Sequence, residues 1–258
     1  MPATLPHLAF LALAGLVAGI IGTAGGITSL ISYPALLAVG IPPLSANVTN
    51  SIALVGSGLG ATLGSQPELR GHRETLRRLV IPSVVGAIGG ALLLLATPPG
   101  VFAWIVPFLI ALAAVLLLAQ PRITRWHHAR DRAPSELLVL AAVFGVALYD
   151  GYFGAGSGVL MLALLLILVE QDLPRSNALK NTLLMLSDLL PAVIFAIAGP
   201  VVWAAVLPLG IGALVGGLIG PAVARRVPRN GLRIAIAACG FALALWLLIQ
   251  AVMSQGAG

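Results

Sequence analysis

The sequence predicts an all-α, polytopic integral membrane protein made of two inverted repeats of about five helical segments each. Three observations support this: an apolar composition, long apolar segments, and a motif pattern that occurs twice. Of the 258 residues, 59% are hydrophobic and only 9% are charged, with a mean hydropathy of +1.07. One water-soluble core cannot bury so much apolar surface. Because the apolar runs are continuous and do not alternate with a period of two, helices are favoured over a β-barrel.

Hydropathy divides the chain into ten apolar segments. They lie at 5–21, 27–40, 47–65, 79–97, 101–119, 136–150, 158–170, 178–198, 201–224 and 231–253. The first lacks the basic region of a signal peptide and is predicted to be a membrane segment. The four segments that flank two glycine clusters, at 22–26 and 154–158, look short against the ~20 residues that cross a bilayer. We therefore expect these four to be broken or re-entrant helices.

Arginine positions predict the orientation of the chain. Four arginines lie in each of the loops 66–78, 120–134 and 224–233, which are predicted to be cytoplasmic. The connections at 41–46, 97–100 and 199–200 carry no charge, and both termini lack Lys and Arg, so these are predicted to lie outside. The assignments agree if each glycine-centred pair enters and returns to the same face, either as two full crossings or as a re-entrant hairpin. The net charge of +6 is thus a topology signal, and we expect no nucleic-acid partner.

The second half of the chain repeats the first. Residues 22–26 (GTAGG) correspond to 154–158 (GAGSG), and Pro-x-Ser-x4-Asn-Ser at 43–51 corresponds to Pro-x-Ser-x4-Asn-Thr at 174–182. A third pair, Pro-x3-Gly-x3-Gly, starts at 82 and again at 208. We therefore predict repeats at 1–120 and 135–254, joined by a basic cytoplasmic linker at 121–134. Because arginine-rich and uncharged loops exchange places between the halves, the repeats are predicted to be inverted, with their glycine clusters meeting near the membrane midplane.

The glycine clusters are the first candidate substrate-binding elements. A sharp turn leaves backbone N–H groups unpaired at the electropositive start of the next half-helix, which attracts an anion. The alternative is that the glycines only allow close helix packing. The residues proposed to bind substrate here are Gly22, Gly25, Gly26, Gly154, Gly156, Ser157 and Gly158.

Polar residues on the two helices that follow the clusters complete the predicted site. Asn50 and Ser51 share one face of the third segment, and Asn181 and Thr182 share the matching face of the eighth. We predict that all four bind substrate, with interhelical hydrogen bonding as the alternative for the asparagines. Ser45 and Ser176, just after proline turns, are instead expected to be N-caps.

Two charged residues stand out within the eighth segment. Asp188 lies seven residues after Asn181, near the middle of an apolar helix, where burial favours the neutral acid. We predict that it couples proton movement to transport, against a structural hydrogen-bonding role. Lys180 is either a charge partner for the substrate or an anchor that extends toward the cytoplasmic interface. Asp150, just before the second cluster, is left without a role.

Several motifs together resemble those of the sulfite exporter TauE/SafE family of membrane transporters. They are the two glycine turns, Asn177-Ala178-x-Lys180, and Gly199-x-Val201-x-Trp203, and the resemblance covers nearly the whole chain. It implies a secondary transporter, in the export direction, of a small sulfur-containing anion such as sulfite or an organosulfonate. An anion channel, or a transporter of another small organic anion, is the alternative.

An intramembrane enzyme or an ATP-driven pump is not expected from the sequence. HExxH, Gly-x-Ser-x-Gly and Gly-x4-Gly-Lys-Ser/Thr motifs are absent, and the single cysteine, Cys239, has no partner for a disulfide or metal site. We expect no cofactor and no metal. The expected partners are membrane lipid and the anionic substrate, in the bacterial inner membrane.

Overall fold

The computed structural model describes residues 4–125, 135–169, 172–224 and 229–255, and within them every regular element is helical. The α-helices are α1 (Leu5–Gly25), α2 (Ser29–Ala38), α3 (Pro43–Gly64), α4 (Arg73–Ala96), α5 (Pro99–Arg125), α6 (Glu136–Tyr152), α7 (Ser157–Leu168), α8 (Leu173–Ala198), α9 (Trp203–Ala224) and α10 (Arg229–Gln255). A 3-10 helix, η1 (Gln66–Leu69), joins α3 to α4. The predicted all-α class is confirmed.

The long helices suit a membrane. α1, α4, α5, α8, α9 and α10 each contain a stretch long and apolar enough to cross one. Large apolar side chains lie on the outer surface, among them Leu5, Ile197 and Leu207, which are 80%, 83% and 69% exposed. Such a surface is stable only in apolar surroundings. The protein is therefore a polytopic membrane protein, as predicted.

Several helices begin earlier than hydropathy indicates. α3 begins at Pro43 where 47 was expected, α4 at Arg73 where 79 was expected, and α8 at Leu173 where 178 was expected. The first turns of these helices carry polar residues, which hydropathy excludes although the helix continues into the polar interface. The arginine-rich loop expected at 66–78 is accordingly η1 and the start of α4.

The predicted lengths of the segments around the glycine clusters are partly wrong. α2 and α7 are short, at 10 and 12 residues, as expected. α1 has 21 residues, however, because the helix continues through Gly22 and Gly25 and turns only at Gly26. A helix accommodates single glycines at a modest cost, so the first cluster interrupts the chain later than its composition suggests.

The N-cap prediction is also wrong. Ser45 lies inside the first turn of α3, which begins at Pro43. At the start of α8 the cap is Asp172, whose carboxylate accepts a hydrogen bond from the N–H of Arg175 at 3.3 Å. Proline is favoured at the first helical position, so each helix begins at the proline turn itself and not at the serine after it.

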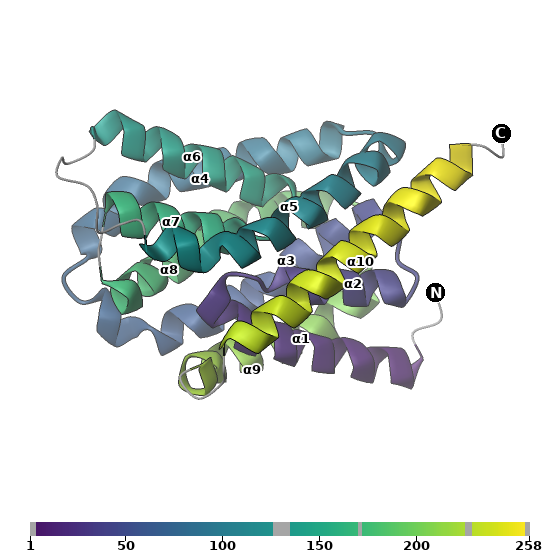
Figure 1. The fold of residues 1–258 in the computed structure, drawn as a ribbon, viewed down its shortest axis with the longest axis horizontal. Coiled ribbons are helices and arrows are strands. Elements are labelled where there is room, and N and C mark those ends of the chain that lie inside the picture. Colours follow the sequence, from purple (N-terminus) through teal and green to yellow (C-terminus); the bar gives the residue numbers. More distant parts are fainter. Residues whose placement is uncertain (1–3, 126–134, 170–171, 225–228, 256–258) are drawn as a thin grey trace.

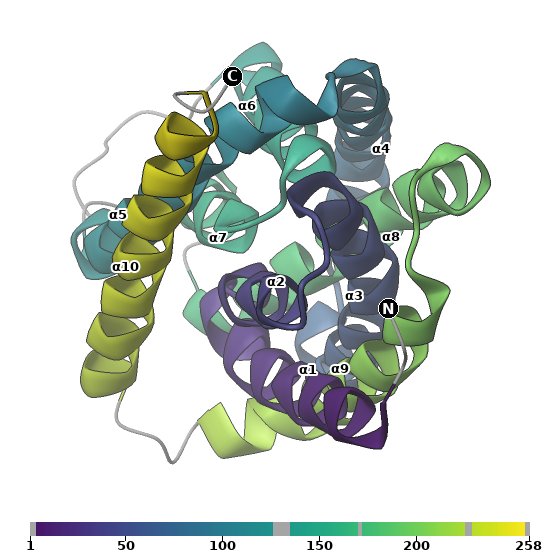
Figure 2. The ribbon, with the colours of Figure 1, turned by 90° about the vertical axis from the view of Figure 1, so that its right-hand side faces the viewer.

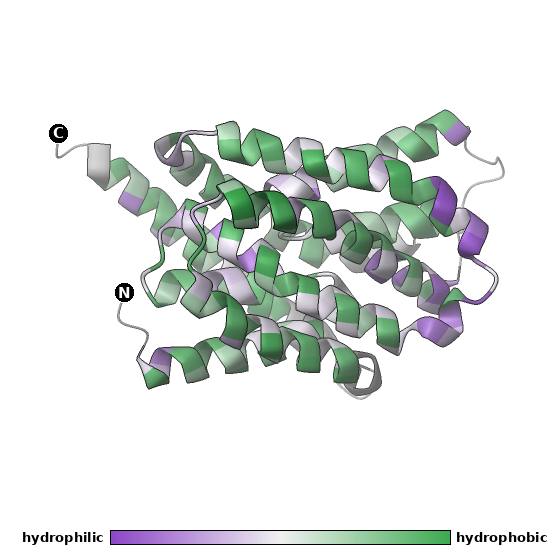
Figure 3. Ribbon diagram, turned by 180° about the vertical axis from the view of Figure 1, so that it is seen from behind, coloured by the Kyte–Doolittle hydropathy of each residue, from purple (hydrophilic) through white to green (hydrophobic). Residues whose placement is uncertain are grey.

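The helices run roughly along the long axis of the molecule, and both ends of the chain lie at the same end of the bundle (Figure 1). Hydrophilic residues gather mainly at the opposite end, where α4, α6 and α8 begin (Figure 3). α1 packs along α9, α4 along α6, and α5 along α10. The short helices α2 and α7 lie inside, between the α5–α10 pair on one side and α3 and α8 on the other (Figure 2).

Candidate functional site

The two glycine clusters meet inside the bundle, as predicted. Gly26 ends α1 in the left-handed conformation with φ of 70°, and its N–H donates to the Gly22 carbonyl at 2.6 Å. A Cβ atom added to Gly158, in the first turn of α7, would lie 2.5 Å from the Cα of Gly26. The two segments therefore touch backbone to backbone, and only glycine allows this approach.

The second turn is formed by two left-handed glycines and held by side chains. Gly154 and Gly156 have φ of 78° and 82°. The hydroxyl of Ser157 donates to the Gly154 carbonyl at 2.7 Å, and the hydroxyl of Tyr149 donates to the Ala155 carbonyl at 2.6 Å. Both bonds are accepted by backbone carbonyls of the turn itself, which follows the end of α6 at Tyr152.

The turns place the first residues of two helices beside each other. α2 begins at Ser29 and α7 at Ser157, and both starts lie at the glycine contact. An edge-on contact between Tyr33 of α2 and Phe153 of the second turn, with ring centroids 5.6 Å apart, joins the two elements. Because the N-terminus of a helix carries a partial positive charge, two such ends near one point favour an anion there.

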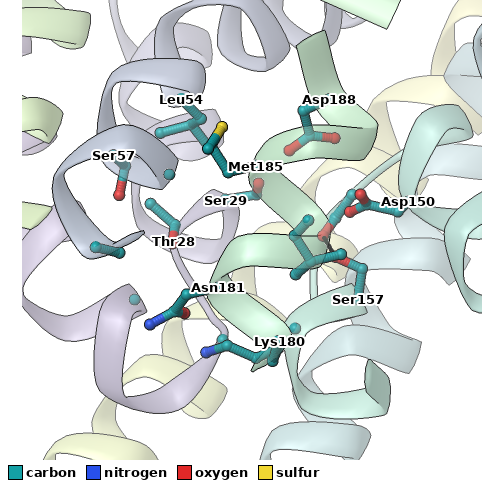
Figure 4. Close-up of a pocket in the computed structure, with 17 residues that line it drawn as sticks. Thr28, Ser29, Leu54, Ser57, Asp150, Ser157, Lys180, Asn181, Met185 and Asp188 are labelled. Carbon is teal, nitrogen blue, oxygen red and sulfur yellow. Dashed lines mark hydrogen bonds between the residues drawn. The ribbon is translucent and has the colours of Figure 1, made fainter. Parts of the chain in front are cut away.

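A cavity of about 90 Å³ lies beside the glycine contact (Figure 4). Eight residues proposed from the sequence line it: Gly22, Gly26, Gly154, Ser157, Gly158, Lys180, Asn181 and Asp188. They come from α1, the second turn, α7 and α8, so the fold brings both halves of the chain to one space.

The other proposed site residues lie outside the cavity lining. The Asn50 amide donates to the Ser29 hydroxyl at 3.2 Å. Ser51 and Thr182 donate to carbonyl groups one turn back in their own helices, at 3.0 Å each. Asn50 therefore positions a lining residue, whereas the two hydroxyls satisfy their own helix backbone. Gly156 packs against Ala113 of α5, and Gly25 is the last residue of α1.

Sequence reasoning missed about half of the cavity lining. The missed residues are Thr28, Ser29, Leu54, Ser57, Gly58, Ala61, Asp150, Leu184 and Met185. Ser57 was within reach, because it follows Asn50 by seven residues on one helical face, just as Asp188 follows Asn181. Thr28 and Ser29 carry no periodic signal, since their place depends on where α1 ends.

Lys180 is a buried residue of the cavity lining. Its side chain is 1% exposed, and its ammonium group lies near Asn181 (Figure 4). The interpretation of Lys180 as an anchor extending to the membrane surface is therefore wrong. The amide nitrogen of Asn181, which is 6% exposed, has no hydrogen-bond partner among the described residues. A buried amide donor without a partner is costly, so this end of the cavity is suited to a hydrogen-bond acceptor.

Two carboxyl groups lie at another part of the cavity wall. Asp188 of α8 and Asp150 of α6 point toward each other (Figure 4), within hydrogen-bonding reach. Within the described ranges, no group of three or more His, Cys, Asp or Glu side chains is arranged to hold a metal ion.

Comparisons with known proteins agree with the geometry of a membrane transport protein. The family model described as Sulfite exporter TauE/SafE matches residues 8–247. A Sinorhizobium protein named probable membrane transporter protein ORF9 is 31% identical over 244 residues, which cover 93% of this chain and 92% of the relative. A Haemophilus influenzae probable membrane transporter protein is 29% identical, covering 83% of each chain. The Escherichia coli probable membrane transporter protein YfcA is 26% identical, covering 80% of this chain and 76% of its own.

Proposed function

Because the chain belongs to the sulfite exporter TauE/SafE family of membrane transporters, we propose that it is a secondary transporter exporting a small sulfur-containing anion, such as sulfite or an organosulfonate. Membership of a transporter family also implies that the protein is not an enzyme. The observation that carries the proposal is a buried lysine beside a buried amide donor that has no hydrogen-bond partner among the described residues, in one cavity at the start of two helices.

The electrostatics of the cavity favour a bound anion. Lys180 supplies a buried amine that can carry a positive charge, and the Asn181 amide supplies a donor. The starts of α2 and α7 add partial positive charge. A sulfur oxyanion has several acceptor oxygens on one centre and can use these donors together.

The cavity volume limits the substrate. A cavity of about 90 Å³ is a small site, which favours small anions such as sulfite and the smallest sulfonates.

We propose that the chain consists of inverted repeats at 1–120 and 135–254, with the linker at 121–134 partly beyond the described residues. The packing supports this, because pairs of helices recur with the halves exchanged. The pairing of α1 with α9 has its counterpart in α6 with α4, and that of α3 with α9 in α8 with α4. Each helix group thus draws a member from both repeats, an arrangement suited to alternating access by rocking about a central site.

The proposed orientation places the termini outside and the arginine-rich end in the cytoplasm. The shared location of the termini, opposite the hydrophilic end, supports it (Figures 1 and 3). The test uses single cysteines at two exposed positions, Gln66→Cys and Gly100→Cys, in a Cys239→Ser background. With a membrane-impermeant thiol reagent on intact bacterial cells, we expect labelling at position 100, and labelling at 66 only after permeabilisation. The reverse pattern would show that the orientation is inverted.

The transport proposal is tested with purified protein in liposomes. We expect saturable binding of sulfite and methanesulfonate, weaker binding of acetate, and counterflow: external labelled anion should accumulate transiently in vesicles preloaded with unlabelled anion. A channel gives no counterflow, so its absence alongside conductive anion flux would favour the channel alternative. Failure of both sulfur anions to bind would overturn the proposed substrate class.

We propose that this transport is proton-coupled through Asp188. An anion in the cavity disfavours a nearby carboxylate, so anion and proton bind with positive linkage and travel in the same direction. Asp188→Asn should retain substrate binding but lose transport driven by a pH gradient. Unchanged dependence on the pH gradient would leave Asp188 a structural residue.

A further inference from the structure

The carboxyl group that faces Asp188 changes the nature of the proton site. We propose that Asp150 and Asp188 together form one proton-binding site, in which the two carboxyl groups share a proton, at the wall of the anion cavity. This inference rests on the proposed transport function and deepens it. It assigns a role to Asp150, and it makes the pair, not Asp188 alone, the group that takes up and releases the proton.

Asp150 and Asp188 bring two helices to one wall of the cavity. Asp150 comes from the last turn of α6 and Asp188 from the middle of α8, and both line the cavity. The two carboxyl groups lie within hydrogen-bonding reach of each other. Two ionised carboxylates this close repel strongly in a low-dielectric interior, whereas a pair holding one proton forms a charge-assisted hydrogen bond.

One oxygen atom of the Asp150 carboxyl group lacks a hydrogen-bond donor among the described residues. Asp150 is 9% exposed, and its Oδ2 atom has no hydrogen-bond partner among the described residues. Ser157 is near the carboxyl group, but it has a single hydroxyl proton, which it donates to the Gly154 carbonyl at 2.7 Å. A proton on Asp188 supplies the donor that the buried oxygen lacks.

A sodium ion is the competing occupant of this pair, because hard cations also bind carboxylate oxygens. The experiment must therefore separate proton coupling from sodium coupling.

The charged groups around the pair define how it is linked to the anion. Among the described cavity-lining residues, the remaining titratable side chain is Lys180, on the same helix as Asp188. Eight residues along a helix correspond to about 12 Å, so the lysine end and the carboxyl end form separate parts of one cavity. Tyr149, the neighbour of Asp150, uses its hydroxyl proton in the bond to Ala155. The pair that shares one proton carries a single negative charge. An anion at the lysine end raises the cost of that charge, so the pair takes up a second proton from water.

The experiment measures protons directly with methanesulfonate, whose own charge is constant across neutral pH. The anion is added to wild-type protein in weakly buffered detergent solution containing a pH dye. We expect uptake of about one proton per anion bound. We also expect the anion Kd to rise about tenfold for each unit increase in pH across the titration of the pair. Binding that leaves the pH and the Kd unchanged would overturn the proton site while leaving anion transport intact.

The variants separate the pair from a single carboxyl. Asp150→Asn and Asp188→Asn each place an amide donor against the remaining carboxylate, which keeps the contact without a proton. We expect both variants to bind methanesulfonate with a pH-independent Kd. We also expect their anion flux to be independent of the imposed pH gradient. Asp172→Asn, the same change at an exposed position of the α8 start, is the matched control and should behave as wild type.

Other outcomes overturn the proposal. Full proton uptake by Asp150→Asn would assign the proton to Asp188 alone. Loss of proton uptake in Lys180→Gln but in neither Asp variant would assign the proton to the lysine. Flux in wild type that follows a sodium gradient at constant pH would identify the pair as a cation site. If neither methanesulfonate nor sulfite binds to folded wild-type protein, it is the proposed function that fails, and this inference fails with it.

Discussion

The two halves of the chain contribute equally to the shape of the cavity but unequally to its charge. Gly26 and Gly158 occupy matching places in the repeated clusters and touch each other. Leu54 and Met185, which match by the spacing of the repeats, both line the cavity. Matching positions of the two halves therefore line the same space, although the turns differ: Gly26 is left-handed, whereas Gly158 lies in the first turn of α7.

The charged side chains that line the cavity all come from the second half of the chain. Lys180 and Asp188 of α8 correspond by the repeat spacing to Thr49 and Ser57 of α3. An ionisable group inside a membrane protein is costly and calls for a partner. The second half therefore contributes the ionisable side chains of the cavity lining, and the first half contributes uncharged ones.

The largest expected effect concerns the backbone contact between the two glycine clusters. Gly158→Ala and Gly26→Ala both place a methyl group against the backbone of the other cluster. We expect each to destabilise the protein by about 1–3 kcal/mol through overpacking, with loss of anion binding. Gly145→Ala is the matched control, because a Cβ there meets nothing within 4 Å and improves helix propensity. Thermal unfolding followed by fluorescence measures all three, and equal stability of Gly158→Ala and Gly145→Ala would contradict a backbone contact.

Hydropathy and motif spacing predicted some features of the fold and not others. Hydropathy and the repeated glycine clusters predicted the helices, and the clusters also predicted that α1–α2 and α6–α7 turn toward each other. Charges in the polar first turns hid the starts of α4 and α8, because hydropathy measures the apolar layer and not the helix. The helix through Gly22 and Gly25 was hidden too, since glycine composition does not say which residue turns.

The cavity shows the same division. Asn181 and Asp188 were found because they share a helical face, a property of sequence spacing. The pairing of Asp150 with Asp188 joins α6 to α8 across 38 positions, and no local pattern records it. Thr182 shares the face of Asn181 in the sequence but lies outside the cavity lining, and its hydroxyl donates to its own helix backbone, which the sequence position does not reveal.

The second prediction separates charge from scaffold at one repeat-related pair. Lys180→Met removes the buried amine while keeping an apolar chain, and we expect methanesulfonate binding to weaken about 10–100-fold. Thr49→Val changes the matching residue, whose hydroxyl accepts a hydrogen bond from the Val202 N–H at 3.0 Å. We expect a loss of about 1–3 kcal/mol in stability with unchanged affinity, because an N–H is left unpaired away from the cavity. Calorimetric binding and thermal unfolding on both variants check this, and a shared loss of affinity would show that the two halves bind the anion equally.

The smallest expected effect is at Ser57, the first-half counterpart of Asp188. Ser57 is buried and lines the cavity, but its hydroxyl carries no charge, so its contribution to a bound anion is that of one neutral hydrogen bond. Ser57→Ala should therefore weaken methanesulfonate binding by about 2–10-fold, equivalent to ~0.5–1.5 kcal/mol, and leave proton uptake unchanged. The matched control is Ser83→Ala in α4, which removes a buried hydroxyl that has no partner among the described residues and lies outside the cavity lining. Its affinity should equal that of wild type. A loss of proton uptake in Ser57→Ala would mean that the first half takes part in the proton site, and the division between a shared shape and a one-sided charge would not hold.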